Sequence, residues 1–228
     1  SGTNRIEIKF SNGTTDDTSD SYIAHPAFTF GTDELQGIWV AKYEASRGNT
    51  TSQVSAPTSS TSVAKSIPGV ASWTNISVSK MFDYAYNTYR NADSHLMKNV
   101  EWGAVAYLTN AIGRIPYINT TQTTGKAGST QNASSKTASY AWNTANGVKA
   151  STTHNVYGIY DMSGGSCEYV AAYYTEESSL YIDSLTSAAD KYVDRYSTAY
   201  SASKKGDAVY ETSNSSSSSG TTSWDGDY

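Results

Sequence analysis

The chain has 228 residues and a formal net charge of −5, with 37% hydrophobic and only 16% charged residues. Disordered chains are usually rich in charge and poor in aromatic residues, so 19 Tyr and 5 Trp argue against disorder of the whole chain. The densest basic spot is Lys204-Lys205, which argues against nucleic acid as a partner. No apolar run is long enough for a membrane span, so we expect no membrane insertion by this segment.

Residues 1–26 are predicted to be an N-terminal strand and linker. Apolar and charged side chains alternate over residues 4–10, which is typical of a short strand, and Asn12-Gly13 predicts a turn after it. Residues 27–228 are expected to form the main domain. Within it, residues 37–44 give the clearest strand signal, because they are β-branched and aromatic and follow a glycine. The Ser1-Gly2-Thr3 start lacks a Met and is typical of a processed or recombinant N-terminus, which leaves a removed leader or anchor open.

Two helices are predicted near the middle of the chain. The first spans residues 80–89, and the second spans residues 96–110 with Ser94 as its N-cap. Their expected apolar stripes are Met81, Ala85 and Tyr89 in the first helix, and Leu96 or Met97, Val100, Ala104 and Leu108 in the second.

Long polar loops and short strands are predicted around these helices. Residues 46–66 and 118–153 are rich in Ser, Thr, Asn and Gly and have no period, which predicts loops. Residues 157–162 and 167–171 are predicted strands, and the glycine-containing residues 163–166 predict a sharp turn between them.

Three segments, in this order, resemble formylglycine-generating-enzyme-like (sulfatase-modifying-factor-like) domains. Residues 37–44, GIWVAKYE, resemble the early strand that ends in a glutamate. Residues 98–108, KNVEWGAVAYL, resemble the "EAEWEYAAR" helix. Residues 155–169, NVYGIYDMSGGSCEY, resemble the signature "N-x-x-G-L-Y-D-M-x-G-N-V-W-E-W". The third segment is the most specific, because many fixed positions agree.

The resemblance implies a C-type-lectin-like α+β fold with two main helices, short irregular antiparallel sheets and long loops. The sequence also resembles non-catalytic surface proteins of bacteria and phages that carry this domain, and some of these relatives are variable proteins of diversity-generating retroelements. There are departures, because Cys167 replaces the signature Trp and Gly165 replaces the Asn. The family's "R-G-G" segment and final "F-R" strand are not found before Tyr228, so the C-terminal part of the family pattern is missing. Either the domain is truncated there, or another chain or a degenerate strand completes the sheet.

The resemblance also implies what the signature residues can do. The family's oxidase chemistry uses a pair of cysteines that hold copper, and Cys167 is the only cysteine here. We therefore expect no enzyme, with Cys167 as a small buried hydrophobe. A calcium ion is implied at the Glu168 carboxylate and the backbone oxygens of Ser163, Gly164 and Ser166. The alternative is that Glu168 accepts hydrogen bonds from the backbone N–H groups of this turn.

The remaining candidate residues are histidines and tyrosines. His25, His95 and His154 have no metal-ligand spacing, and no G-x-S-x-G elbow supports a hydrolase, so we expect His95 to be structural. Tyrosine buries a large area at a small entropy cost and is common in binding loops, although it also packs well in strands. The ligand-binding candidates are Tyr173, Tyr174, Tyr181, Tyr192, Tyr196 and Tyr200.

The function predicted from these features is a ligand- or receptor-binding module on a bacterial cell surface or a phage particle, such as an adhesin or a phage receptor-binding domain. Its expected location is extracellular, on the cell surface or on the virion, and its partner a host-surface protein or glycan. One alternative is a structural subunit of a filament, pilus or virion that self-associates by sharing strands. Another alternative is an oxidase-type enzyme on the same scaffold.

Overall fold

The computed structural model describes residues 7–10, 21–47, 63–114, 141–162, 164–166, 168–174 and 180–196. Side chains are described in all of these except residues 7–10, 21–24, 174 and 180. The chain divides into two compact units, Ser1–Trp39 and Val40–Tyr228, whereas the sequence suggested a boundary after residue 26. Helices and short sheets both occur, so the architecture is α+β, as the sequence predicts.

The first unit is built from short strands. It contains β1 (Glu7–Phe10), β2 (Ser21–Ala24), the 3-10 turn η2 (Pro26–Phe28), β3 (Thr29–Phe30) and β4 (Asp33–Glu34). The strand expected in residues 4–10 is confirmed as β1, and it pairs antiparallel with β2, which lies within the expected linker. Strands β3 and β4 form a second antiparallel pair. His25 is buried and caps η2, because its Nδ1 accepts a hydrogen bond from the Ala27 backbone N–H at 3.1 Å. The predicted Asn12-Gly13 turn lies outside the described residues.

Helix α1 (Val78–Thr88) confirms the first predicted helix in the second unit. It begins after Ser77, whose hydroxyl accepts a hydrogen bond from the Lys80 backbone N–H at 3.5 Å. Its buried face differs from the predicted stripe, because the Tyr84 ring stacks on Trp73 with 4.9 Å between ring centroids. The buried residues are Ser79, Phe82 and Tyr84.

Helix α2 (Asn99–Ala111) confirms the second predicted helix, but the predicted N-cap is wrong. The Ser94 hydroxyl accepts from the Tyr89 backbone N–H at 3.0 Å and donates to a carbonyl in the last turn of α1, so it closes the end of α1 instead. The start of α2 is satisfied from a distant segment, because Asp194 Oδ2 accepts from the Val100 backbone N–H at 3.0 Å.

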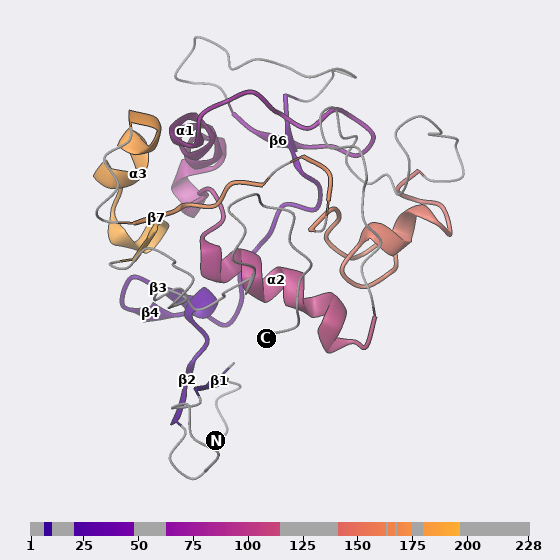
Figure 1. Cartoon of the computed structure of the whole chain (residues 1–228), viewed down its shortest axis with the longest axis horizontal. Coiled ribbons are helices and arrows are strands. Elements are labelled where there is room, and N and C mark those ends of the chain that lie inside the picture. The colour runs from indigo at the N-terminus through magenta and orange to yellow at the C-terminus, as the bar shows by residue number, and fades with distance from the viewer. Residues whose placement is uncertain are drawn as a thin grey trace, which may run out of the picture. The chain divides into compact units, whose positions relative to one another are not determined.

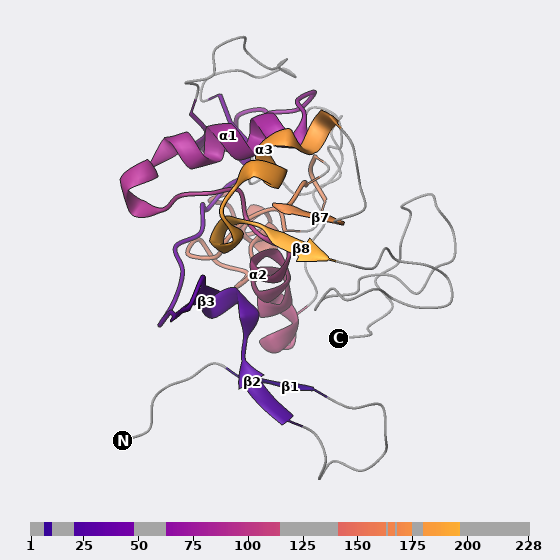
Figure 2. The ribbon, with the colours of Figure 1, turned by 90° about the vertical axis from the view of Figure 1, so that its left-hand side faces the viewer.

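In this unit one pair of helices packs together, and the third helix lies across the pair's longer member. Helix α3 (Asp183–Ser187) packs on α1, and the Ser184 backbone N–H donates to the Ser79 hydroxyl at 3.1 Å. Helix α2 lies across α1, since Figure 1 shows α1 end-on and α2 from the side, and Figure 2 shows the reverse. The 3-10 turns of this unit are η3 (Arg90–Ala92), η6 (Gly147–Ala150), η7 (Leu180–Ile182) and η8 (Asp190–Tyr192).

The strands of the second unit are short and only partly match the prediction. Strands β5 (Ala45–Ser46) and β6 (Lys65–Ser66) pair antiparallel at the two ends of the predicted loop 46–66, where no strand was predicted. Strands β7 (Ala172–Tyr174) and β8 (Asp194–Tyr196) pair in parallel, so the prediction of antiparallel sheets is wrong for this pair. The parallel register matters for the site, because it sets which residues are paired: Tyr173 pairs with Arg195, and Tyr174 pairs with Tyr196.

The strands predicted at residues 37–44 and 157–162 are not strands in the structure. The two segments do lie side by side, because the Tyr160 backbone N–H donates to the Lys42 carbonyl at 2.9 Å. The Tyr43 backbone N–H donates to the Ser66 hydroxyl at 2.9 Å, so a side chain takes the place of a ladder partner. The strand predicted at 167–171 is wrong as well: β7 begins one residue beyond its predicted end.

An aromatic cluster forms the core beside these segments. The Tyr43 and Tyr160 rings lie 5.1 Å apart between centroids, and Trp142 meets Tyr43 edge-on at 5.9 Å. Ala150 completes the cluster. These rings explain the apolar sequence of both segments: their apolar side chains fill a core between irregular segments rather than cover the face of a sheet. Among the described residues, no helix is both long and apolar enough to cross a bilayer.

Candidate functional site

The three signature-like segments of the sequence meet in the structure. The Ser166 backbone N–H donates to Glu44 Oε1 at 3.1 Å, which links the first segment to the third. The Trp102 indole N–H donates to Glu168 Oε2 at 2.6 Å, which links helix α2 to the third. We use the name acidic cluster for the carboxyl-bearing residues gathered here, which are Glu44, Asp161 and Glu168.

Glu44 lies at the centre of this meeting point, directly before β5. Its Oε1 accepts from Ser166, and its Oε2 accepts a short hydrogen bond from the Ser72 hydroxyl. Burial raises the pKa of Glu44 to about 7, although the bonds from Ser72 and Ser166 lower it in part. A single carboxyl group therefore joins three segments that are distant in sequence.

The glycine turn is shaped to receive that carboxyl group. Gly164 and Gly165 both have a positive φ, +83° and +79°, which side-chain-bearing residues rarely adopt. A Cβ atom on Gly165 would lie 2.5 Å from Glu44 Oε1. Glycine is therefore required at position 165 for two reasons: its backbone conformation and the close approach of Glu44.

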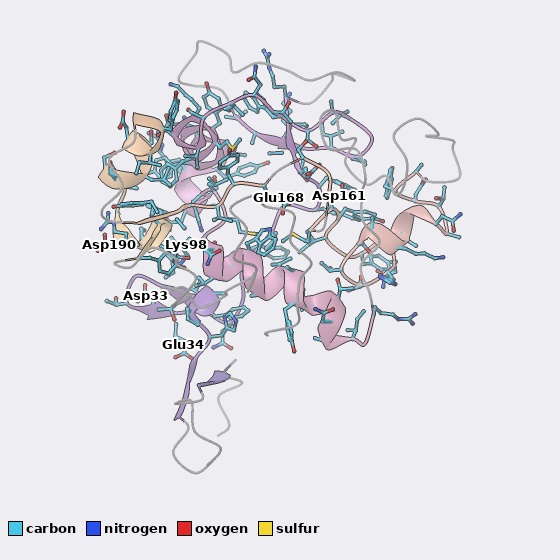
Figure 3. The ribbon with its side chains drawn as sticks, in the orientation of Figure 1. Asp33, Glu34, Lys98, Asp161, Glu168 and Asp190 are labelled. Carbon is cyan, nitrogen blue, oxygen red and sulfur yellow. The ribbon has the colours of Figure 1, made fainter. Side chains whose placement is uncertain are left out.

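Glu168 and Asp161 complete the acidic cluster. Glu168 is exposed as a residue, but its carboxyl group is turned toward Trp102, and burial of that group raises its pKa to about 8. The charges of Glu44 and Asp161 raise it further. Asp161 is fully buried, with a φ of +66°. Figure 3 shows Glu168 and Asp161 beside each other, away from Lys98 at the start of α2.

The glutamate that binds the turn is not the one considered from the sequence. The alternative to calcium had Glu168 accepting from the turn N–H groups, whereas Glu44 accepts from Ser166 and Glu168 accepts from Trp102. Ser163 and Cys167 lie outside the described residues. No three His, Cys, Asp or Glu side chains of the described stretches come together so that they could hold a metal ion. A calcium ion at this turn would therefore need backbone carbonyl oxygens as well.

Comparison with known proteins adds no relative to this picture. No protein-family model matches the sequence, and no curated protein matches it at a significant level. The contacts between the three segments are therefore the evidence for the site, and the family resemblance stays a prediction.

A second group of buried charges lies at the start of α2. Glu101 Oε2 accepts from the Lys98 backbone N–H at 2.9 Å and lies 3.1 Å from His95 Nε2. The Lys98 ammonium is 3.7 Å from Glu101 Oε1, and both side chains are about 95% buried, being 5% exposed. We use the name charge network for His95, Lys98, Glu101 and Asp194.

Burial and ion pairing shift the pKa values of the charge network in opposite directions. Burial would raise the pKa of Glu101, but His95 and Lys98 outweigh it and hold that pKa below its usual value. Burial would likewise lower the pKa of His95, but Glu101 and the Asp93 carbonyl raise it. His95 is thus structural, as the sequence predicts, and its role is to compensate a buried carboxylate. The pKa of Asp194 is raised by burial, in part offset by the Val100 N–H.

The predicted tyrosine site is only partly brought together. Tyr192 is 8% exposed and packs against Tyr86 and His95, so it serves the core, which is the packing alternative considered from the sequence. Tyr181 is 70% exposed in η7. Tyr174 is placed only by its backbone in β7, and Tyr200 lies outside the described residues.

Tyr173 and Tyr196 lie on opposite faces of the β7–β8 pair, because side chains alternate along a strand. The inner face covers the start of α2, where Tyr196 Oη accepts from the Asn99 side chain at 3.2 Å. The outer face carries Tyr173 and its register partner Arg195, whose guanidinium lies 5.9 Å from the Tyr173 ring centroid. Sequence reasoning missed Arg195, and only the parallel register reveals it.

Proposed function

We propose that this chain is a non-catalytic ligand-binding module, displayed on a bacterial cell surface or a phage particle, with the C-type-lectin-like fold that its signature segments resemble. The observation that carries the proposal is the outer face of the β7–β8 pair, where half-buried Tyr173 and exposed Arg195 lie side by side. Tyrosine and arginine are enriched among the residues that dominate binding energy. Arg195 is also bonded to Asp190 and to the Ala188 carbonyl, so the pair is ordered before a ligand arrives.

The chemistry of the acidic cluster supports a non-catalytic role. The whole sequence holds one cysteine, whereas the oxidases that it resembles hold copper with a pair. Glu44 is bonded to Ser72 and Ser166, and Glu168 is bonded to Trp102. These bonds give both carboxyl groups a structural task, which is to hold the signature turn against α2 and β5.

The test is a binding screen on protein and glycan arrays with the wild type and two matched variants. The double variant Tyr173→Ala with Arg195→Ala is expected to lose at least about tenfold in affinity, as truncation of such anchor residues usually does. The control is Tyr89→Ala, which removes a tyrosine that is 71% exposed on the connection between α1 and α2. Equal binding by the double variant and the control contradicts this surface, and no binding on any array contradicts the function.

A calcium ion at the signature turn is kept in the proposal as a structural group. Its ligands would be the Glu168 carboxylate and the backbone oxygens of Gly164 and Ser166, the oxygen donors that calcium prefers. The neighbouring acids Glu44 and Asp161 favour a cation there, because their charges act on Glu168. Calcium is then expected to raise the melting temperature of the wild type at about pH 8 but not that of Glu168→Gln. An equal response of both proteins contradicts the site.

A further inference from the structure

One loop of the second unit presents an aromatic ring to solvent on a fixed backbone. Tyr157 is 88% exposed and belongs to the segment 151–160, which we name the Tyr157 loop. The base of the loop is closed by the Thr152 backbone N–H, which donates to the Ile159 carbonyl at 2.8 Å. The ring is therefore open to contact with a ligand.

Hydrogen bonds inside the loop hold the backbone of Tyr157. Asn155 Oδ1 accepts from the Tyr157 backbone N–H at 2.9 Å and from the Thr153 hydroxyl at 3.0 Å. The Ser151 hydroxyl donates to the Asn155 carbonyl at 2.7 Å. Gly158 has no room for a side chain, because a Cβ would lie 2.6 Å from the Thr153 hydroxyl oxygen. The backbone that carries the ring is therefore ordered in advance, which reduces the entropy lost on binding.

Lys42 ties the loop to the aromatic core. Its ammonium donates a short hydrogen bond to the Val156 carbonyl, next to Tyr157. It also lies 5.6 Å from the ring centroids of Tyr43 and Trp142 and 5.9 Å from that of Tyr160. The positive charge is thus met by three ring faces and a carbonyl oxygen on the core side of the loop.

Apart from the His154 imidazole, the loop residues that flank Tyr157 carry uncharged side chains. Residues 150–160 contain no Asp, Glu, Lys or Arg. Asn155 is exposed, and its amide uses one of its two donors on the Thr153 carbonyl at 3.3 Å. A protein partner usually covers about 800 Å² of each surface, far more than one ring. A pyranose offers a C–H face of the size of one ring, with hydroxyl groups at its rim.

From this geometry we infer that the Tyr157 loop binds an uncharged saccharide, whose ring stacks on Tyr157 while its hydroxyl groups bond to Asn155 and to the phenol. This inference rests on the proposed role of the chain as a binding module, but it uses a surface other than Tyr173 and Arg195. Two properties of the loop indicate this ligand class: an exposed ring on an ordered backbone, and flanking hydroxyl and amide groups that can bond to saccharide hydroxyls.

The experiment uses an array that carries uncharged, sialylated and sulfated oligosaccharides, with the full chain as the probe. The wild type is expected to bind uncharged glycans, and Tyr157→Ala to lose at least about tenfold. Tyr157→Phe keeps the ring and is expected to lose less than about threefold. The control Tyr89→Ala is expected to bind as the wild type does, and unchanged melting temperatures show that all variants are folded.

The outcomes separate this inference from the proposed function. Glycan binding that survives in Tyr157→Ala, binding only to charged glycans, or no glycan binding at all each overturns the saccharide site. If a protein ligand is then found and Tyr173→Ala with Arg195→Ala abolishes its binding, the proposed function stands without the saccharide site. If the double variant keeps glycan binding and Tyr157→Ala loses it, the saccharide site stands and the outer face of β7–β8 is not its surface.

Discussion

Glutamate carboxyl groups are shielded from water in both the acidic cluster and the charge network, but their surroundings shift the pKa in opposite directions. Glu101 lies between His95 and Lys98, and its pKa is held below the ordinary value. Glu44 and Glu168 have pKa values raised to about 7 and about 8, and none of the described interactions that set these values comes from a basic side chain. The same residue type is therefore an anion in one cluster and holds a proton close to neutral pH in the other.

This difference shows what each cluster requires of the protein. The charge network needs His95 and Lys98 beside Glu101, because a buried charge left alone is costly. The acidic cluster needs hydrogen-bond donors, a glycine turn that leaves room for a carboxyl group, and a pH at which protons remain bound. Each of the following experiments disturbs one of these requirements, beginning with the largest expected effect.

Glu101→Gln is expected to destabilise the protein most, by about 3 kcal/mol, because it leaves the buried Lys98 ammonium without its counter-charge. Urea denaturation measures the change in the free energy of unfolding. Asp183→Asn, at an exposed carboxyl in α3, is the control and is expected to change it by less than about 0.5 kcal/mol. Equal effects of the two variants would show that the charge network is not needed for stability.

Gly165→Ala is expected to cost about 2–3 kcal/mol, because it combines an unfavourable φ with a Cβ pressed against Glu44. Gly69→Ala is the matched control: its φ is +70°, but nothing lies within 4 Å of the added Cβ, so about 1 kcal/mol is expected. The difference between the two variants isolates the contact with Glu44. If both cost the same, the turn is not shaped around that carboxyl group.

The pH dependence of stability should distinguish the two clusters. A glutamate whose pKa is about 4.5 when unfolded and about 7 or 8 when folded binds more protons in the native state, so stability falls as pH rises from about 4.5 to about 8. His95, whose folded pKa is also raised, acts in the same direction above about pH 6.5. Glu101 acts in reverse and loses its contribution below about pH 4.5.

The expected result is a melting temperature that is highest near pH 5 and falls by at least about 10 °C toward pH 8.5, because the two raised pKa values together correspond to several kcal/mol. Calorimetry of Glu44→Gln and Glu168→Gln should give flatter profiles, since the variants have no proton to lose at these positions. A profile of the variants that is as steep as that of the wild type would assign the pH dependence to other groups.

Asp194→Ala is expected to have the smallest effect, about 1 kcal/mol, because it removes one side-chain acceptor from the start of α2. Asp194→Asn keeps an acceptor oxygen and is expected to lose less than half of that. Amide hydrogen exchange of Val100 reports the loss of the bond directly. Unchanged protection in Asp194→Ala would mean that the first turn of α2 does not depend on β8.

The sequence could predict the helices because their signals are local. The spacing of apolar residues placed α1 and α2 within a few residues of their observed bounds, although neither predicted stripe is the buried face. The strands at residues 37–44 and 157–162 were predicted wrongly. Tyr43 and Tyr160 make these segments look like strands, but both side chains pack in an aromatic core cluster and the segments form no strand ladder. Ser94 shows the same limit, since a serine between two helices can serve the end of one or the start of the next.

The candidate site depends on contacts that spacing along the chain cannot reveal. Glu44 and Ser166 lie 122 positions apart, and Asp194 and Val100 lie 94 apart. The resemblance placed Glu44, Trp102 and Glu168 among its motif residues but did not indicate which glutamate bonds the turn. The parallel register of β7 and β8, which pairs Arg195 with Tyr173, has no local signal at all.

The most direct test of the contrast between the two clusters is a carbon-13 NMR titration of the glutamate carboxyl groups in the folded protein. We expect Glu101 to titrate below its ordinary value, Glu44 at about pH 7 and Glu168 at about pH 8. If all three carboxyl groups titrate together near 4.5, the acidic cluster is an ordinary set of ionised side chains and the account is wrong.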